Sequence, residues 1–91
     1  MLESIIDDIS NFDHVGNLQI WDILNSLYHL TQDLISFQLS VDEYVEIINS
    51  INLGNVSTGS INEIDTMAEL KVLMHNAINI ATTMHFDQGE V

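Results

Sequence analysis

Apolar residues recur at intervals of three and four positions along most of this 91-residue chain, and no proline interrupts them. Such spacing places side chains on one face of an α-helix, whereas a half-buried strand needs strict alternation of apolar and polar residues. No convincing alternation is present, and no Asn-Gly pair marks a hairpin. The sequence therefore predicts an all-α fold: a small bundle of about four helices in one domain over residues 1–86, followed by a frayed acidic tail over 87–91.

The first half of the chain predicts two helices separated by a turn over residues 13–17. The first helix carries its apolar stripe at Leu2, Ile5, Ile6, Ile9 and Phe12. Asn17 can accept from the free amides of the second helix, which we expect from Leu18 to about Phe37. This helix has apolar side chains on two sides, a pattern typical of a central helix. Trp21 belongs to one of these stripes, so we expect it in the core rather than at an interface.

The third helix has the clearest start signal. Ser40 and Glu43 are spaced as a capping box, and Leu39 and Tyr44 occupy the positions of a hydrophobic staple. We expect this helix to end at Gly54, which can adopt the left-handed backbone conformation common at helix ends. Residues 54–60 are rich in Gly, Asn, Ser and Thr and predict a linker.

The last helix has two candidate starts. Ser60 with Glu63 and Thr66 with Glu69 are both spaced as capping boxes. They predict a short turn carrying Ile61 and Ile64, followed by a helix over about residues 67–85. The residues expected to line one face of that helix are Met67, Leu70, Met74, Ala77, Ile78 and Ala81.

Charge is the most one-sided property of the chain. Fourteen Asp and Glu residues accompany a single Lys and no Arg, so the formal charge at pH 7 is -13. Direct binding to nucleic acid or to anionic lipid is disfavoured, because both require a basic surface. The chain has no cysteine, no apolar run long enough to span a membrane and no basic start typical of a signal peptide. We therefore expect a cytoplasmic protein.

Catalytic and metal-binding motifs are not recognisable. The four histidines, His14, His29, His75 and His85, belong to no nucleophile motif and show no spacing typical of metal ligands. No Gly-rich phosphate loop or calcium-binding loop is present. We therefore predict a non-enzymatic protein with no catalytic, metal-binding or cofactor-binding residues, and no cofactor.

The acidic residues are the candidate binding residues. Many lie near predicted helix starts, where the helix dipole favours negative charge, and this rule accounts for about half of them. It does not explain why the last turns lack Lys and Arg, which ordinary helices place there. We therefore predict that the partner is a basic protein surface, such as that of a nucleic-acid-binding protein. The predicted contact residues are Asp42, Glu43, Glu46, Glu63, Asp65 and Glu69, with Asp7 and Asp8 as a second patch.

In composition and size the chain is similar to phage-encoded DNA mimics and to anti-restriction and anti-CRISPR inhibitors. Acids three or four residues apart on a helix lie about 5–6 Å apart, a charge density comparable to that of duplex DNA. The resemblance implies an inhibitor that occupies the nucleic-acid-binding surface of a nuclease or another effector. It rests on no motif and transfers no residue.

Two alternatives remain. Thirteen Ile and ten Leu residues exceed what four short helices need internally, which favours a homodimer or an assembly subunit that docks through an apolar helix face, the acids serving solubility alone. The segments 39–48 and 65–74 also loosely resemble two helices of acyl carrier proteins. Val41 stands where that family attaches phosphopantetheine to Ser, so no carrier site is expected.

Overall fold

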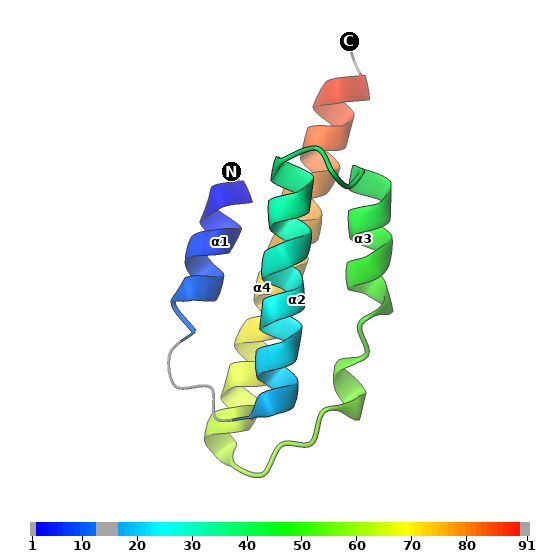
Figure 1. Ribbon diagram of the computed structural model, residues 1–91. Helices are drawn as coiled ribbons and strands as arrows, with labels where there is room; N and C mark the ends of the chain where they lie inside the picture. Colours follow the sequence, from blue (N-terminus) through cyan, green and yellow to red (C-terminus); the bar gives the residue numbers. More distant parts are fainter. Residues whose placement is uncertain (1, 13–16, 90–91) are drawn as a thin grey trace.

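The computed structural model describes residues 2–12 and 17–89, with side-chain surroundings as far as residue 84. Within these residues the chain forms helices and no strand, which confirms the predicted all-α bundle (Figure 1). The elements in chain order are α1 (Leu2–Ser10), α2 (Leu18–Ile35), α3 (Val41–Ser50), the 3-10 turn η1 (Leu53–Asn55) and α4 (Ile61–Gly89).

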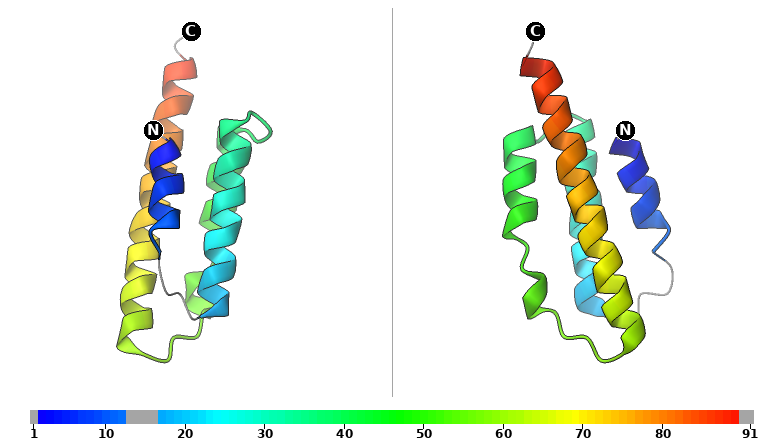
Figure 2. Two further views of the ribbon diagram at one scale, coloured as in Figure 1. Left: turned by 60° about the vertical axis from the view of Figure 1, so that its left-hand side comes forward. Right: turned by 180° about the vertical axis from the view of Figure 1, so that it is seen from behind.

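Successive helices run antiparallel, so α1 and α3 point one way while α2 and α4 point the other (Figure 1). Both α1 and α3 pack against α2 and also against α4. We call the end where α2 and α4 begin the basal end, and the end where α3 begins the apical end. At 1.5 Å per residue α4 is about 43 Å long and α2 about 27 Å. The last turns of α4 therefore extend past the other helices at the apical end (Figure 2).

The core lies between the helices and takes residues from all four. The predicted face of α4 is confirmed, because Leu70, Ala77 and Ala81 have no exposed surface and Ile78 is half-buried. Two small alanines on the inner face let α4 approach the core closely. The fully buried large residues of the other helices are Ile5, Ile20, Leu24, Leu27, Tyr44 and Ile48.

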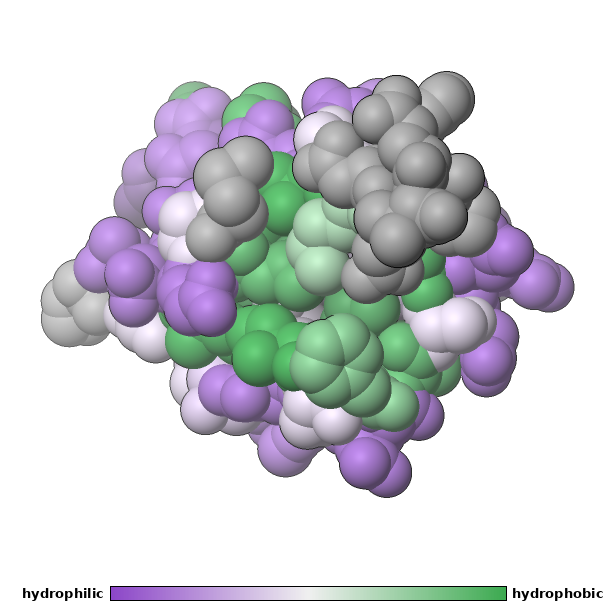
Figure 3. Space-filling view, turned by 90° about the horizontal axis from the view of Figure 1, so that it is seen from above, coloured by the Kyte–Doolittle hydropathy of each residue, from purple (hydrophilic) through white to green (hydrophobic). Residues whose placement is uncertain are grey.

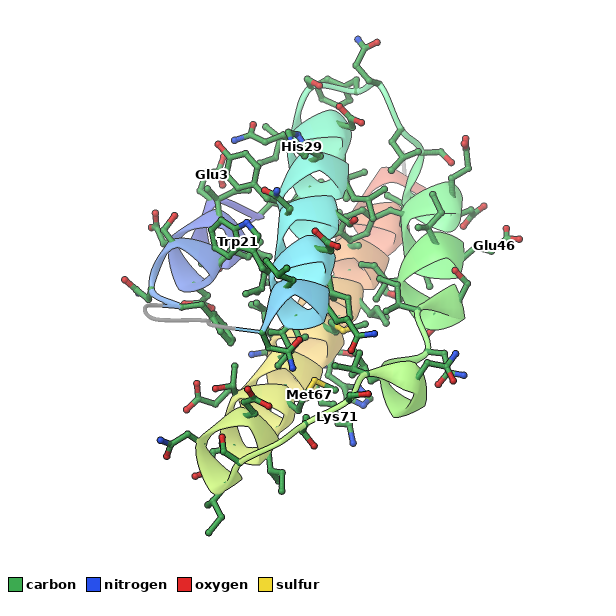
Figure 4. All side chains as sticks on the ribbon, turned by 60° about the horizontal axis from the view of Figure 1, so that its bottom comes forward. Glu3, Trp21, His29, Glu46, Met67 and Lys71 are labelled. Carbon is green, nitrogen blue, oxygen red and sulfur yellow. The ribbon has the colours of Figure 1, made fainter. Side chains whose placement is uncertain are left out.

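The prediction that Trp21 belongs to the core is wrong. Its side chain is 47% exposed and lies on the side of α2 that faces α1 (Figure 4). The buried face of α2 is centred on Ile20, Leu24 and Leu27, and successive residues are about 100° apart around a helix. Trp21 is therefore at the margin of that face. A neighbour as short as α1, about 14 Å at 1.5 Å per residue, leaves the tryptophan partly uncovered.

Two predicted helix ends also differ from the structure. Helix α3 ends at Ser50 rather than Gly54, because Ile51 adopts an extended conformation and Asn52 starts η1 by accepting from the Gly54 amide at 2.9 Å. Gly54 has no positive φ, so the left-handed ending expected there is wrong. Helix α2 ends at Ile35, two residues before the expected Phe37. Phe37 itself has a φ of 61°.

Helix α4 starts at Ile61, six residues before the predicted start. Ser60 is the residue that caps it, since its hydroxyl accepts from the Glu63 amide at 3.2 Å. Thr66 is inside the helix and donates to the Asn62 carbonyl at 2.9 Å, so the second capping box is wrong. At the other end the helical backbone continues to Gly89, beyond the predicted end near residue 85, because no glycine or proline lies between Ile61 and Gly89. Residues 90–91 of the expected tail, and residues 13–16 of the first turn, lie outside the described residues.

A polar network ties the linker to the basal end of the bundle. Asn17 caps α2 as predicted, because its side-chain oxygen accepts from the amides of Gln19 at 2.9 Å and Ile20 at 3.3 Å. The same side chain donates to the Ser57 carbonyl at 2.6 Å, and the Gln19 side chain accepts from the Ser57 amide at 2.9 Å. One asparagine therefore both starts α2 and holds the segment that leads into α4.

Asn17→Ala removes the cap and the bond to the linker together. Loss of an N-cap side chain costs about 0.5–2 kcal/mol, so we expect the free energy of unfolding to fall by about 1–2 kcal/mol, measured by urea denaturation. Asn17→Ser keeps a capping oxygen and should recover about half of that loss. Equal stability of the alanine variant and the natural protein would show that the network contributes nothing.

One buried hydrogen bond joins α2 to α3. Thr31, the one buried polar residue of α2, donates to the Leu27 carbonyl at 2.7 Å. Its oxygen is 2.7 Å from the Tyr44 hydroxyl, which therefore donates to it. Burial raises the pKa of Tyr44 above its ordinary value of 10.0. The hydroxyl thus stays protonated in the folded protein at pH values where an exposed tyrosine ionises.

This pKa shift makes stability depend on alkaline pH. Unfolding releases the Tyr44 proton once the pH exceeds the ordinary value of about 10, so the free energy of unfolding should fall as the pH rises beyond that point. Tyr44→Phe should cost about 1 kcal/mol at neutral pH and flatten the alkaline fall. Denaturation at pH 8 to 11 measures both effects, and Tyr28→Phe is the control that should keep the fall. A Tyr44→Phe variant with an undiminished fall contradicts this assignment.

Candidate protein-binding surface

Three predicted contact residues form one continuous surface on α3. Asp42, Glu43 and Glu46 are all exposed and lie opposite the side that buries Tyr44 and Ile48. Glu46 points away from the bundle (Figure 4). We call this set of three residues the α3 acidic face.

The first turn of α3 holds part of this face in place. The Ser40 hydroxyl accepts from the Glu43 amide at 3.1 Å and lies 3.0 Å from the Glu43 carboxylate, to which it donates. The predicted Ser40 cap is therefore confirmed. Asp42 and Glu43 also lie at the positive end of the α3 dipole, which stabilises negative charge.

The predicted contact residues of α4 lie elsewhere. Because α3 begins at the apical end and α4 at the basal end, Glu63 and Asp65 are at the opposite end of the bundle from the first turn of α3 (Figure 1). Asp65 and Glu69 are exposed. The Glu63 carboxylate accepts from the Gly59 amide at 2.6 Å and lies 3.5 Å from the side-chain nitrogen of Asn17. Glu63 therefore stabilises the start of α4, and the six residues do not form a single face.

One residue of the second predicted patch lines the same cavity as one residue of the first. Asp7 and Asp8 are exposed on α1. Asp8 lines a cavity of about 240 Å³ between α1 and α4, and Glu69 lines the same cavity with Phe12 and Val72. The packing of α1 against α4 thus brings together two acids that are 61 positions apart in the sequence, a pairing that no local sequence signal indicates.

The C-terminal ends of the helices, where the helix dipole is negative, carry no compensating basic residue. None of the four α-helices has a basic residue in its last turn, as expected from the sequence. Lys71, the only Lys or Arg in the chain, is exposed near the middle of α4 and lines a cavity of about 200 Å³ with Ile48 and His75. Neither α3 nor α1 therefore contains a Lys or Arg residue.

The histidines form no recognisable centre in the part of the chain that the structure describes. His29 and His75 are exposed on α2 and α4, and the His29 ring packs edge-on against Tyr28 with ring centroids 5.6 Å apart. His14 and the side chain of His85 lie outside the described residues. Among residues 2–12 and 17–84, no three or more His, Cys, Asp or Glu residues are grouped closely enough to hold a metal ion. No helix described here is long and apolar enough to cross a bilayer.

The apical end carries an apolar surface that sequence patterns did not indicate. Apolar residues gather at its centre, and hydrophilic residues lie at the outer edges of the view (Figure 3). Phe37 is 84% exposed there, more than any other large apolar residue among those whose side chains the structure describes. Two cavities flank it, one of about 530 Å³ and one of about 290 Å³. We call this region the apical surface; its residues are Leu34, Ile35, Phe37, Leu39 and Met84.

The fold and these surfaces define a small antiparallel helical bundle with an acidic exterior. The chain matches no protein-family model, and comparison with curated proteins and with solved structures finds no significant match. The function is therefore inferred from the geometry of the bundle and from its charge.

Proposed function

We propose that this protein is a non-enzymatic binding protein whose acidic surface engages a basic protein surface. The observation that carries this proposal is the exposed α3 acidic face together with the absence of basic residues from the last turn of every helix. Uncompensated like charges destabilise a small fold by self-repulsion. A basic partner would convert that repulsion into favourable pairing when the complex forms.

The spacing of the acids suits a partner that normally binds nucleic acid. Asp42 and Glu46 are one helical turn apart, and residues at this spacing have Cβ atoms about 5–6 Å apart. A helix presents such charges rigidly, as a duplex presents its phosphates. We therefore propose that the protein imitates nucleic acid and acts as an inhibitor, covering the basic surface of a nuclease, restriction or CRISPR effector, or another DNA-binding protein.

Exposed apolar residues favour a second candidate, an assembly or adaptor subunit that docks through an apolar surface. Besides Phe37, the outward side of α4 exposes Ile61, Ile64 and Val72, and α2 exposes Leu18. Docking through these residues, against another protein or against a second copy, would leave the acids to maintain solubility.

Affinity capture from the native host, followed by competition, tests the first candidate. The captured protein should bind DNA or RNA by itself, and nucleic acid should displace the acidic protein from it. If the captured protein binds no nucleic acid, and if substitutions at Ile61 and Val72 abolish capture while Asp42→Asn and Glu46→Gln do not, the adaptor function replaces the inhibitor.

A further inference from the structure

Phe37 combines two features that folding does not explain. Its φ of 61° lies in the left-handed region, where a bulky side chain is strained and glycine is not. The Phe37 amide donates to the Leu34 carbonyl at 3.2 Å and the Gln38 amide to the Asp33 carbonyl at 2.8 Å, the bonds of a Schellman motif, which usually has glycine at this position. The ring is 84% exposed, so burial does not offset the strain. A strained residue of this kind is a candidate for function.

The surroundings of Phe37 provide space for another side chain. The cavity of about 530 Å³ lies on the side of Phe37 toward α3 and is lined also by Leu39 and Val41. The cavity of about 290 Å³ lies toward α1 and is lined also by Leu2 and Ile35. Leu34 and Met84 line both cavities. Phe37 thus stands between two open hollows at the end of the bundle, each with apolar residues in its wall. An incoming apolar side chain would contact the ring and these wall residues together.

The charged residues around the apical surface indicate which kind of segment would bind there. Asp42 and Glu43 line the larger cavity and Glu3 lines the smaller one. A backbone hydrogen bond lowers the pKa of Glu3 below its ordinary value, so this carboxylate is ionised at neutral pH. A second copy of a chain with a charge of -13 would set one acidic rim against another. A segment with apolar residues on one side and Lys or Arg on the other complements both the hollows and the rim.

We infer that the apical surface is a docking site for a basic amphipathic segment of a partner protein. An apolar side chain of that segment would insert beside Phe37, and its cationic residues would pair with carboxylates on the rim. The choice of a basic occupant rests on the proposed function, whereas the position of the site rests on Phe37 and the two cavities.

Binding of a designed probe to the full chain tests this inference. The probe is an 18-residue peptide with Leu on one helical face and Lys on the other, and titration calorimetry measures its affinity. Phe37→Gly should weaken binding by about tenfold or more, as expected for the loss of a central aromatic contact. Glycine suits the left-handed position, so the same variant should raise the unfolding midpoint by about 5 °C. The expected result is therefore a more stable protein that binds the probe less well.

Two controls test whether binding depends on the apical position of the apolar side chain and on the apolar residues of the probe. Leu18→Ala removes an exposed apolar side chain at the basal end and should leave the affinity for the probe within about twofold of the natural protein's. A second peptide with Gln at every Leu position keeps the Lys residues and should bind at least tenfold more weakly than the probe, because it has no apolar anchor.

The outcomes distinguish this inference from the proposed function. If Phe37→Gly leaves the affinity unchanged while binding remains sensitive to salt, the docking site is overturned and the acidic binding surface stands. If Phe37→Gly abolishes binding but salt has no effect, the apical site stands and the electrostatic function falls. If sedimentation shows a concentration-dependent dimer that Phe37→Gly dissociates, the occupant is a second copy and the inference is overturned.

Discussion

Leu70→Ala is expected to lower the free energy of unfolding by about 2–5 kcal/mol, the usual cost of emptying a well-packed leucine site. Leu70 has no exposed surface and lies on the inner face of α4, which packs against both α1 and α3. Leu70 belongs to a core built from side chains of all four helices, so closing the space left by the substitution would require several elements to move. A domain of this size has a total stability of only about 5–15 kcal/mol, so the variant should lose a large share of its stability.

Val72→Ala is the matched control, two residues along the same helix. Val72 is 60% exposed on the outer face of α4, so its truncation should change stability by no more than about 0.5 kcal/mol. Urea denaturation of the two variants measures the difference. Equal losses at both positions would mean that α4 does not bury the face described here.

Neutralising the α3 acidic face is expected to have the largest effect on binding. Asp42→Asn, Glu43→Gln and Glu46→Gln together should weaken the complex with the captured partner on the order of 100-fold at low salt, because each variant side chain loses its pairing with a cation of the partner. The substitutions preserve side-chain size, and Gln at position 43 keeps an acceptor near the Ser40 hydroxyl that now bonds to Glu43 at 3.0 Å. The helical bundle should therefore persist, which circular dichroism checks.

A second triple variant controls for net charge alone. Asp22→Asn, Asp33→Asn and Asp87→Asn remove the same number of charges from acids outside the predicted contact residues. Asp22 and Asp33 are exposed on α2. This variant should lose at most about tenfold in affinity, through weaker long-range steering. If the two triple variants lose equal affinity, total charge governs the interaction and the α3 acidic face has no special role.

Sequence patterns predicted those parts of the fold that depend on neighbouring residues. The caps at Asn17 and Ser40 are local contacts between a side chain and a nearby amide, so a short stretch of sequence determines them. The start of α4 was less predictable because Ser60 and Thr66 are both suitable caps. Ser60 caps the helix where the Asn17 side chain also contacts Ser57 and Glu63. These contacts join residues 40 or more positions apart, so the local sequence does not indicate them.

The features that define the surfaces depend on how the helices pack. Trp21 is exposed because α1 is short, and Asp8 and Glu69 line one cavity because α1 packs against α4. Neither fact can be obtained from the periodicity of a single helix. The end of α2 was predicted to within two residues, but nothing at Phe37 indicated a left-handed conformation, because that position after a helix is usually occupied by glycine or asparagine. The acids of α3 and α4 looked equivalent in the sequence, yet the antiparallel connection separates them and commits Glu63 to an internal contact.

Salt dependence of the affinity for the captured partner tests the central claim most directly. Electrostatic pairing between an acidic and a basic surface is screened over about 10 Å at 0.1 M salt and about 3 Å at 1 M. Calorimetric titrations between about 50 and 500 mM salt should therefore show a steep loss of affinity, and the α3 triple variant should show a shallower one. An affinity that stays constant across this range would contradict an acidic protein that binds by imitating nucleic acid.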